Sequence, residues 1–155
     1  MPDITIRPAT EADLPELARL WYEKAALPGA DRRLTLLPDG RVRWTEAMRR
    51  RLADPSALEL VAERDAVARG YLVAGLQPGP PGFAPELLCV ITDMALDLHH
   101  YQGGLGRALV ETARAWGKSH GAAGLVAQVP HRSAVEQAFW RSLGATVWAD
   151  LMWLK

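Results

Sequence analysis

Hydrophobic and polar positions follow two different periods along this chain, and each change of period marks a predicted element. Residues 4–6 alternate apolar and polar side chains, which predicts a first strand. Thr10 and Asp13 then resemble an N-terminal helix cap. Two apolar stripes at helical spacing follow, namely Leu14, Leu17, Ala18 and Trp21, and then Trp44, Ala47, Met48 and Leu52. Two helices therefore precede the main sheet, and the second ends at Asp54-Pro55.

The rest of the chain alternates strands with helices. The further predicted strands are residues 58–63, 67–76, 87–96, 125–129 and 147–154. Arg64-Asp65-Ala66 separates the first two of them as a hairpin turn. A helix that Gly121 closes follows a Gly-rich turn, and Ser133 with Glu136 forms the capping box of a last helix.

The predicted element order is β-α-α-β-β-β-α-β-α-β, which indicates a mixed α/β fold. Its first half is antiparallel and its second half contains a βαβ unit. We therefore expect a central mixed, mostly antiparallel sheet flanked by about four helices. A chain of 155 residues fits one domain, residues 1–155.

Composition and charge exclude several classes of function. Lys and Arg total 18 and so do Asp and Glu, so no net charge attracts nucleic acid or an anionic membrane. No apolar run approaches the length of a membrane span, and the N-terminus lacks a signal-peptide pattern. Cys89 is the only cysteine, and its apolar neighbours predict a buried side chain. The histidines and this cysteine lack metal-ligand spacing. We expect a cytoplasmic protein without a metal.

The turn before the helix that begins near residue 105 carries the clearest chemical signal. Glycines 103, 104 and 106 allow close backbone approach, and the first N–H groups of a helix bind anions. A pyrophosphate fits such a site. A dinucleotide-binding motif requires a third glycine where Leu109 stands. Gly117-Lys118-Ser119 looks like the end of a phosphate-binding loop but lies at a helix end, and Thr112 stands where that loop needs glycine.

This turn and the strand before it resemble those of the GNAT N-acetyltransferases, whose motif for acetyl-coenzyme A (acetyl-CoA) is Q/R-x-x-G-x-G/A. Gly104-Leu105-Gly106 matches the second half of the motif, and residues 92–97 resemble the strand end before it. The element order agrees over nearly the whole chain. Three positions depart from the family pattern. Tyr101 stands where the motif has Arg or Gln. Trp140 stands where the family often has a tyrosine that acts as general acid, and Ser133 stands where the family has an asparagine that caps the helix.

The resemblance implies an acetyl-CoA site. The N–H groups of Gln102, Gly103, Gly104, Leu105, Gly106 and Arg107 would bind the pyrophosphate, with Ser133 completing the cofactor-binding set. The backbone of Met94 to Leu96 would pair with the pantetheine arm. The Leu96 N–H would face the thioester oxygen, on which negative charge grows during transfer.

Asp93 is the candidate general base, because it interrupts an apolar strand beside the expected thioester. Deprotonating an alkylamine with a pKa of about 10.4 costs about 4.6 kcal/mol at pH 7, so a base is useful. The structural alternative is a carboxylate that caps local backbone at a strand bulge. His99 and His100 are expected to be solvated, and Trp44 is a candidate for the acceptor pocket.

The predicted function is transfer of an acetyl group from acetyl-CoA to a primary amine of a small molecule or peptide, by direct attack in a ternary complex. Two alternatives remain open. One is a protein of the same fold that binds an acyl-CoA without turnover, suggested by Trp140 at the acid position, and the other is a structural interaction module. A homodimer is also possible.

Overall fold

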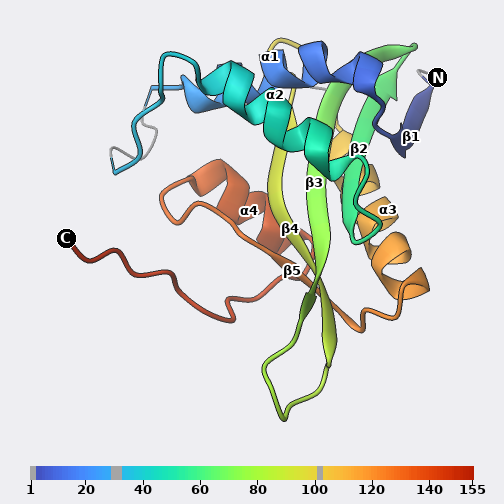
Figure 1. The fold of residues 1–155 in the computed structure, drawn as a ribbon, viewed down its shortest axis with the longest axis vertical. Coiled ribbons are helices and arrows are strands. Elements are labelled where there is room, and N and C mark those ends of the chain that lie inside the picture. The colour runs from blue at the N-terminus through green and yellow to red at the C-terminus, as the bar shows by residue number, and fades with distance from the viewer. Residues whose placement is uncertain (1–2, 29–32, 101–102) are drawn as a thin grey trace.

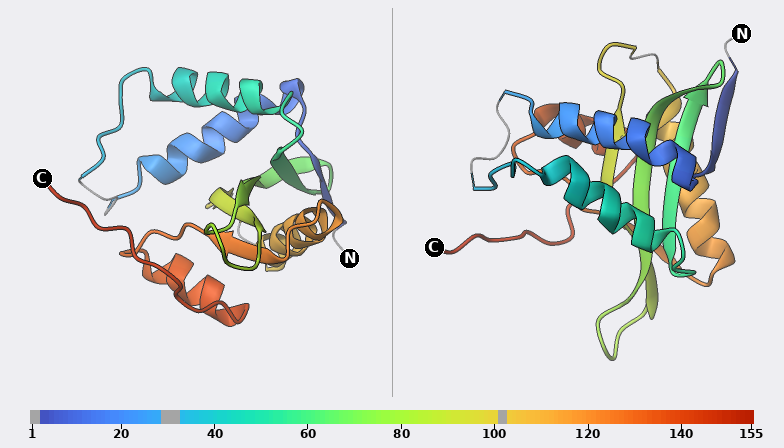
Figure 2. Two further views of the ribbon diagram at one scale, coloured as in Figure 1. Left: turned by 60° about the horizontal axis from the view of Figure 1, so that its bottom comes forward. Right: turned by 45° about the horizontal axis from the view of Figure 1, so that its top comes forward.

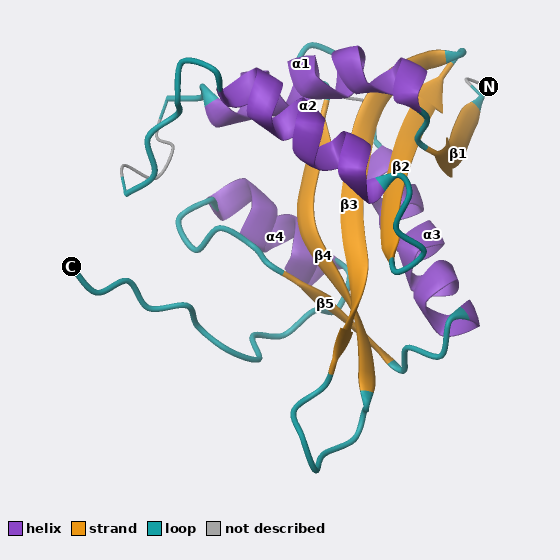
Figure 3. Ribbon diagram, in the orientation of Figure 1, coloured by secondary structure: helices purple, strands orange, loops and turns teal. Residues whose placement is uncertain are grey.

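The computed structural model describes residues 3–28, 33–100 and 103–155, which form a sheet covered by helices (Figure 1). In chain order the elements are β1 Ile4–Pro8, a 3-10 turn Glu11–Asp13, α1 Leu14–Ala25, α2 Gly40–Arg51, β2 Ala57–Arg64, β3 Val67–Pro78, β4 Leu87–Leu96, α3 Leu105–Ser119, β5 Gly124–Ala127 and α4 Ala134–Ser142. The mixed α/β class is thus confirmed, and Figure 3 separates the two kinds of element.

The five strands of the described residues lie in the order β1-β2-β3-β4-β5. β1 to β4 pair antiparallel, and β5 joins β4 in parallel, as the predicted mostly antiparallel sheet requires. Asp65 and Ala66, both with positive φ, form the tight turn between β2 and β3. This confirms the hairpin predicted at residues 64–66.

Helices cover both faces of the sheet. α1 and α2 lie side by side over one face, and α3 packs on the other (Figures 1 and 2). The α3 side holds the larger core, with Leu72, Ile91 and Leu109 among its fully buried members. The α1 side holds a second cluster, which includes Leu20 and Tyr71. Each face of the sheet therefore supplies its own apolar layer.

A β-bulge at Thr92 changes which residues of β4 face each layer. Val73 of β3 lies opposite Asp93, and the next pair joins Ala74 to Ile91, so Thr92 is the extra residue. Side chains normally alternate between the faces with a period of two. The bulge instead sends Ile91 to the α3 side and Asp93 to the side of α1 and α2. The charged residue that interrupts the apolar strand, Asp93, thus directly follows a bulge.

The final strand predicted at residues 147–154 does not form. The sheet ends at β5, and the chain after α4 is neither helix nor strand. A strand forms only where an edge of a sheet lies alongside to complete its hydrogen bonds. Apolar composition favours such a strand but cannot supply that edge, and within this chain the segment does not lie along β5.

Candidate active site

β4 and β5 separate part-way along their length, which opens an edge of β4. Their ladder ends at the pair Ile91 and Ala127, with one further bond from the Gln128 N–H to the Ile91 carbonyl oxygen (2.9 Å). Residues 93–96 of β4 continue to pair with β3 but have no strand on the other side among the described residues. An extended ligand can therefore add to this edge as a strand would.

The backbone groups of Met94 and Leu96 point to this open edge. The Asp97 N–H donates to the Arg69 carbonyl oxygen at 2.7 Å, so Asp97 faces β3. Because N–H groups alternate between the two edges of a strand, the Leu96 N–H faces away from β3, and so does the Met94 backbone two residues earlier. The bulge at Thr92 is what brings these two residues, rather than their neighbours, to the edge.

The start of α3 lies beside this edge. Gly104, the residue before the helix, has φ of 100°, a conformation that favours glycine, and the nearest atom to a Cβ placed there is a side-chain carbon at 3.9 Å. Gly106 has a different reason to be glycine, since a Cβ would come within 3.0 Å of the Phe139 ring of α4. It permits close packing of α3 against α4.

One pocket gathers most of the predicted cofactor residues. It lies between the end of β4, the start of α3 and α4, and its lining comprises Leu96, Gly104, Leu105, Gly106, Arg107, Phe139, Ser142 and Leu143. The unpaired N–H groups at the start of α3 border it, which suits an anion. These features fit the pyrophosphate and arm of a coenzyme A. Gln102, also predicted here, and Tyr101 lie outside the described residues.

Asp93 is held from two sides. The phenol O–H of Tyr71, on β3, donates to Oδ2 of Asp93 at 2.6 Å. Lys24 Nζ, in the last turn of α1, lies 3.5 Å from Oδ1. The Asp93 side chain is only a quarter exposed. The carboxylate is therefore oriented by a buried donor, which the alternative of a local backbone cap does not explain.

Lys24 links Asp93 to the open edge of β4 and to α4. Its ammonium donates to the Met94 carbonyl oxygen at 2.6 Å and lies 3.0 Å from Oε1 of Glu136. Lys24 could not be identified from the sequence, because nothing there distinguishes it from a solvated lysine at a helix end. Asp93, Glu136 and Lys24 together carry a net charge of −1. This group of three charges lies where the strands separate.

The buried phenol of Tyr71 stays protonated and can donate its hydrogen bond to Asp93. It is 1% exposed, and burial together with the Asp93 carboxylate raises the pKa of its phenol far above the usual range. Its ring meets Trp44 with centroids 5.4 Å apart, and Trp44 stacks on Trp21 at 5.8 Å. The candidate pocket residue Trp44 thus supports the tyrosine that holds Asp93.

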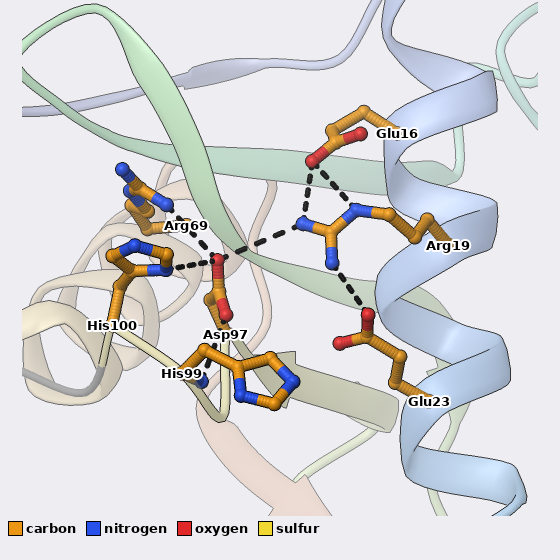
Figure 4. A network of polar contacts seen from close by, with 7 residues as sticks. All are labelled: Glu16, Arg19, Glu23, Arg69, Asp97, His99 and His100. Carbon is orange, nitrogen blue, oxygen red and sulfur yellow. Dashed lines mark hydrogen bonds and ion pairs between the residues drawn. The ribbon is translucent and has the colours of Figure 1, made fainter.

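A polar network anchors the chain as it leaves β4 towards the start of α3 (Figure 4). Asp97, 2% exposed, accepts from the His99 N–H at 3.0 Å and contacts Arg69 at 3.1 Å, His100 at 3.2 Å and Arg19 at 3.6 Å. Burial by itself raises the pKa of Asp97, but the bonds from His99, Arg69 and His100 outweigh it and lower the value. His99 and His100 therefore help to fix this loop.

Several other predicted residues have structural roles. Ser133 caps α4 by accepting from the Glu136 N–H at 3.3 Å, and Trp140 is buried in the core against Phe139. A Cβ on Gly117 would come within 2.7 Å of the Cys89 side chain, so this glycine serves helix packing. Cys89 is buried, as expected. No three potential metal ligands gather anywhere in the described part of the chain.

Known proteins resemble this chain in sequence pattern and in fold. The model of the acetyltransferase (GNAT) family matches residues 17–145. The aminoglycoside N-acetyltransferase AAC(6')-Iy, solved in complex with CoA, is 17% identical with a TM-score of 0.77, over 100% of this chain and 95% of that one. AAC(6')-IG from Acinetobacter haemolyticus is 21% identical with a TM-score of 0.78 over 97% of both chains. A transcriptional regulator from Bacillus halodurans is 19% identical with a TM-score of 0.80 over 99% of both chains. Comparison with curated proteins gave no match.

Proposed function

Because the chain belongs to the GNAT acetyltransferase family, we propose that residues 1–155 act as a single N-acetyltransferase domain, which moves an acetyl group from acetyl-CoA to a primary amine. The observation that carries the proposal is the position of Asp93. It lies beside the open edge of β4, and the end of that strand lines a pocket together with the start of α3. A carboxylate, a strand edge that no other described strand covers, and a helix start that can bind an anion together suit this reaction.

The cofactor would be held by backbone rather than by charged side chains. The N–H groups at residues 102–107 would bind the pyrophosphate, with Gly104 providing the turn and Ser133 fixing the start of α4. The edge of β4 from Met94 to Leu96 would bind the pantetheine arm. The Leu96 N–H would donate to the acetyl oxygen as charge develops on it, a contribution typically worth about 3 kcal/mol. Acetyl-CoA itself supplies an activated acetyl thioester.

Asp93 would accept the proton that the acceptor amine must lose before it attacks. Tyr71 keeps one carboxylate oxygen hydrogen-bonded, so the other is directed towards the Lys24 side of the site. Trp140 is buried in the core and lacks an acidic group, so we propose that the thiol leaves without a protein acid. The reaction would be direct, with no acetyl group attached to the protein.

We propose an acceptor with a protonated amine. Asp93 and Glu136 present two carboxylates to the site and Lys24 offsets only one of them, so a further cation is favoured. Small molecules and peptides both carry such amines. The related AAC(6') enzymes are named for aminoglycosides, which are polyamines, and this agrees with the charge of the site.

We also propose that the protein works in the cytoplasm, without a metal, nucleic acid or membrane as a partner. Its opposite charges balance, which gives it no general attraction to polyanions. Among the described helices, none has the length and apolarity to cross a bilayer.

Release of the CoA thiol, measured with acetyl-CoA and a panel of amines, tests the proposed activity. We expect release that depends on the amine and falls at least a hundredfold in Asp93→Asn. Calorimetry with acetyl-CoA runs alongside. Binding without release for any amine would favour the acyl-CoA-binding protein, and no heat of binding would favour the structural module.

A further inference from the structure

The ammonium of Lys24 lies at the open edge of β4. Nζ donates to the Met94 carbonyl oxygen at 2.6 Å and lies farther from Oε1 of Glu136 (3.0 Å) and Oδ1 of Asp93 (3.5 Å). Its closest partner is thus a backbone oxygen that faces away from β3. Lys24 reaches this oxygen from the last turn of α1, and its side chain is 28% exposed.

The proposed function puts the acetyl thioester at the same edge of β4. There the Leu96 N–H would donate to the acetyl oxygen, and Leu96 is two residues from Met94 along the strand. Two residues of an extended strand span about 7 Å. The four-carbon stem of a lysine is flexible enough to carry its nitrogen over part of such a distance. The Lys24 amine and the acetyl group would therefore lie within reach of one another.

Asp93 is already oriented towards this amine. Tyr71 donates to Oδ2 at 2.6 Å, and Oδ1 is the oxygen that lies 3.5 Å from Nζ of Lys24. The carboxylate that would take the proton from an acceptor amine thus faces a primary amine of the protein itself. The side chains of Lys24 and Asp93 are each only about a quarter exposed, which limits competition from bulk water.

A purely structural ion pair does not explain why this residue is a lysine. Arginine binds carboxylates through two N–H groups at once and keeps its proton, so it is better suited to a bridge between two carboxylates. Nearby pairs use it, as at Arg19 and Arg69. The other two lysines of the chain, Lys118 and Lys155, are exposed. Lys24 is thus the one lysine beside the site.

We propose that the protein acetylates its own Lys24 when acetyl-CoA is bound and no acceptor amine occupies the site. The inference rests on the proposed function, because it uses the same thioester and the same base. Asp93 accepts one proton from the Lys24 ammonium, and the lone pair on Nζ attacks the thioester carbonyl carbon. A C–N bond forms, the C–S bond breaks, and a second proton passes from nitrogen to sulfur. The products are N-acetyl-lysine and the free thiol.

This modification is a side reaction, separate from direct transfer to an acceptor. It converts the Lys24 ammonium to a neutral amide, so Asp93 and Glu136 lose the cation that they share. Two carboxylates without that cation attract a positively charged acceptor more strongly.

Mass spectrometry of the protein and its peptides, after incubation with acetyl-CoA alone, tests the proposal. We expect Lys24 to gain one acetyl group at a rate that saturates with acetyl-CoA and does not depend on protein concentration, because the reaction occurs within one site. Chemical acetylation of Lys118 and Lys155 provides the background, which rises in proportion to acetyl-CoA. Lys24→Arg keeps the charge and should show only this background. Lys118→Arg is the matched control and should keep the fast acetylation.

Asp93→Asn tests the step itself. Loss of the base should slow acetylation of Lys24 at least a hundredfold, while calorimetry still detects bound acetyl-CoA. Equal rates at all three lysines, or a fast rate at Lys24 that Asp93→Asn leaves unchanged, would overturn the proposal.

The proposal and the proposed function can fail separately. An unmodified Lys24 in a protein that releases thiol with an amine would overturn self-acetylation and leave the proposed function standing. Saturable acetylation of Lys24, with no thiol release for any amine, would support self-acetylation and exclude transfer to those acceptors.

Discussion

Removing the hydroxyl of Tyr71 tests whether a buried donor holds the candidate base. Tyr71→Phe keeps the ring between the sheet and Trp44 but leaves Oδ2 of Asp93 without its 2.6 Å hydrogen bond. Hydrogen bonds to charged groups contribute about 1.5–3 kcal/mol. Because the Asp93 side chain is a quarter exposed, water replaces part of the lost bond, so we expect the lower end of this range.

A double-mutant cycle isolates that interaction. Urea unfolding of the unmodified protein, Tyr71→Phe, Asp93→Ala and the double variant should give a coupling energy of about 1.5 kcal/mol. In thiol release, Tyr71→Phe alone should lower turnover roughly tenfold, since 1.4 kcal/mol corresponds to a factor of ten. Tyr22→Phe, at an exposed tyrosine that contacts Arg41 through its ring, is the matched control and should change neither quantity.

Additive effects of the two substitutions on unfolding would refute the reasoning, because they would mean that the hydroxyl and the carboxylate do not interact. A coupling energy near the expected value with unchanged turnover would keep the contact but remove its role in orienting the base.

Three further predictions concern proton transfer, the core and stability. Asp93→Asn should lower turnover more at pH 7 than at pH 9.5, because the higher pH supplies neutral amine without a base; equal losses at both values would indicate a structural role. Trp140→Phe should change turnover less than tenfold while lowering the free energy of unfolding by on the order of 1–3 kcal/mol, since this indole is buried in the core; a hundredfold loss of turnover at an unchanged melting temperature would contradict this. Burial, partly offset by Arg51, raises the pKa of Glu59 from 4.5 to about 7. Between about pH 4.5 and pH 7 the folded protein therefore keeps the Glu59 carboxyl protonated, whereas the unfolded chain has lost that proton. The free energy of unfolding should fall by about 3 kcal/mol at most as the pH rises through this range. Glu59→Gln should flatten this slope in urea unfolding at pH 5 and 8, and an unchanged slope would exclude Glu59 as its source.

The sequence was a good guide where local patterns determine structure. Periodicity located the helices and the paired strands, and the cap at Ser133 and the turn at Gly104 lie where their residue types predicted. Both depend on neighbours along the chain, so they can be recognised in sequence. Asp93 could likewise be singled out as a charged residue in an apolar strand, and its role as the base stays a prediction.

Contacts between distant segments could not be predicted in this way. Lys24 contacts Met94 and Glu136 only because α1 ends where β4 and β5 separate. The residue pattern of α1 does not indicate where the helix ends relative to the sheet. The bulge at Thr92, which decides that Met94 and Leu96 face the open edge, depends on the register with β3. The residues after α4 have the composition of a strand, but composition does not say which edge they meet.

Titration of acetyl-CoA into Gly104→Val, followed by calorimetry, tests the central claim that the start of α3 holds the cofactor. Valine at φ of 100° displaces the backbone that would approach the pyrophosphate. Gly121→Val is the matched control, because Gly121 also has positive φ (86°) but lies beyond the far end of α3. We predict that the unmodified protein and Gly121→Val bind acetyl-CoA, whereas folded Gly104→Val does not. Equal affinity of a folded Gly104→Val variant would contradict the assignment of this site.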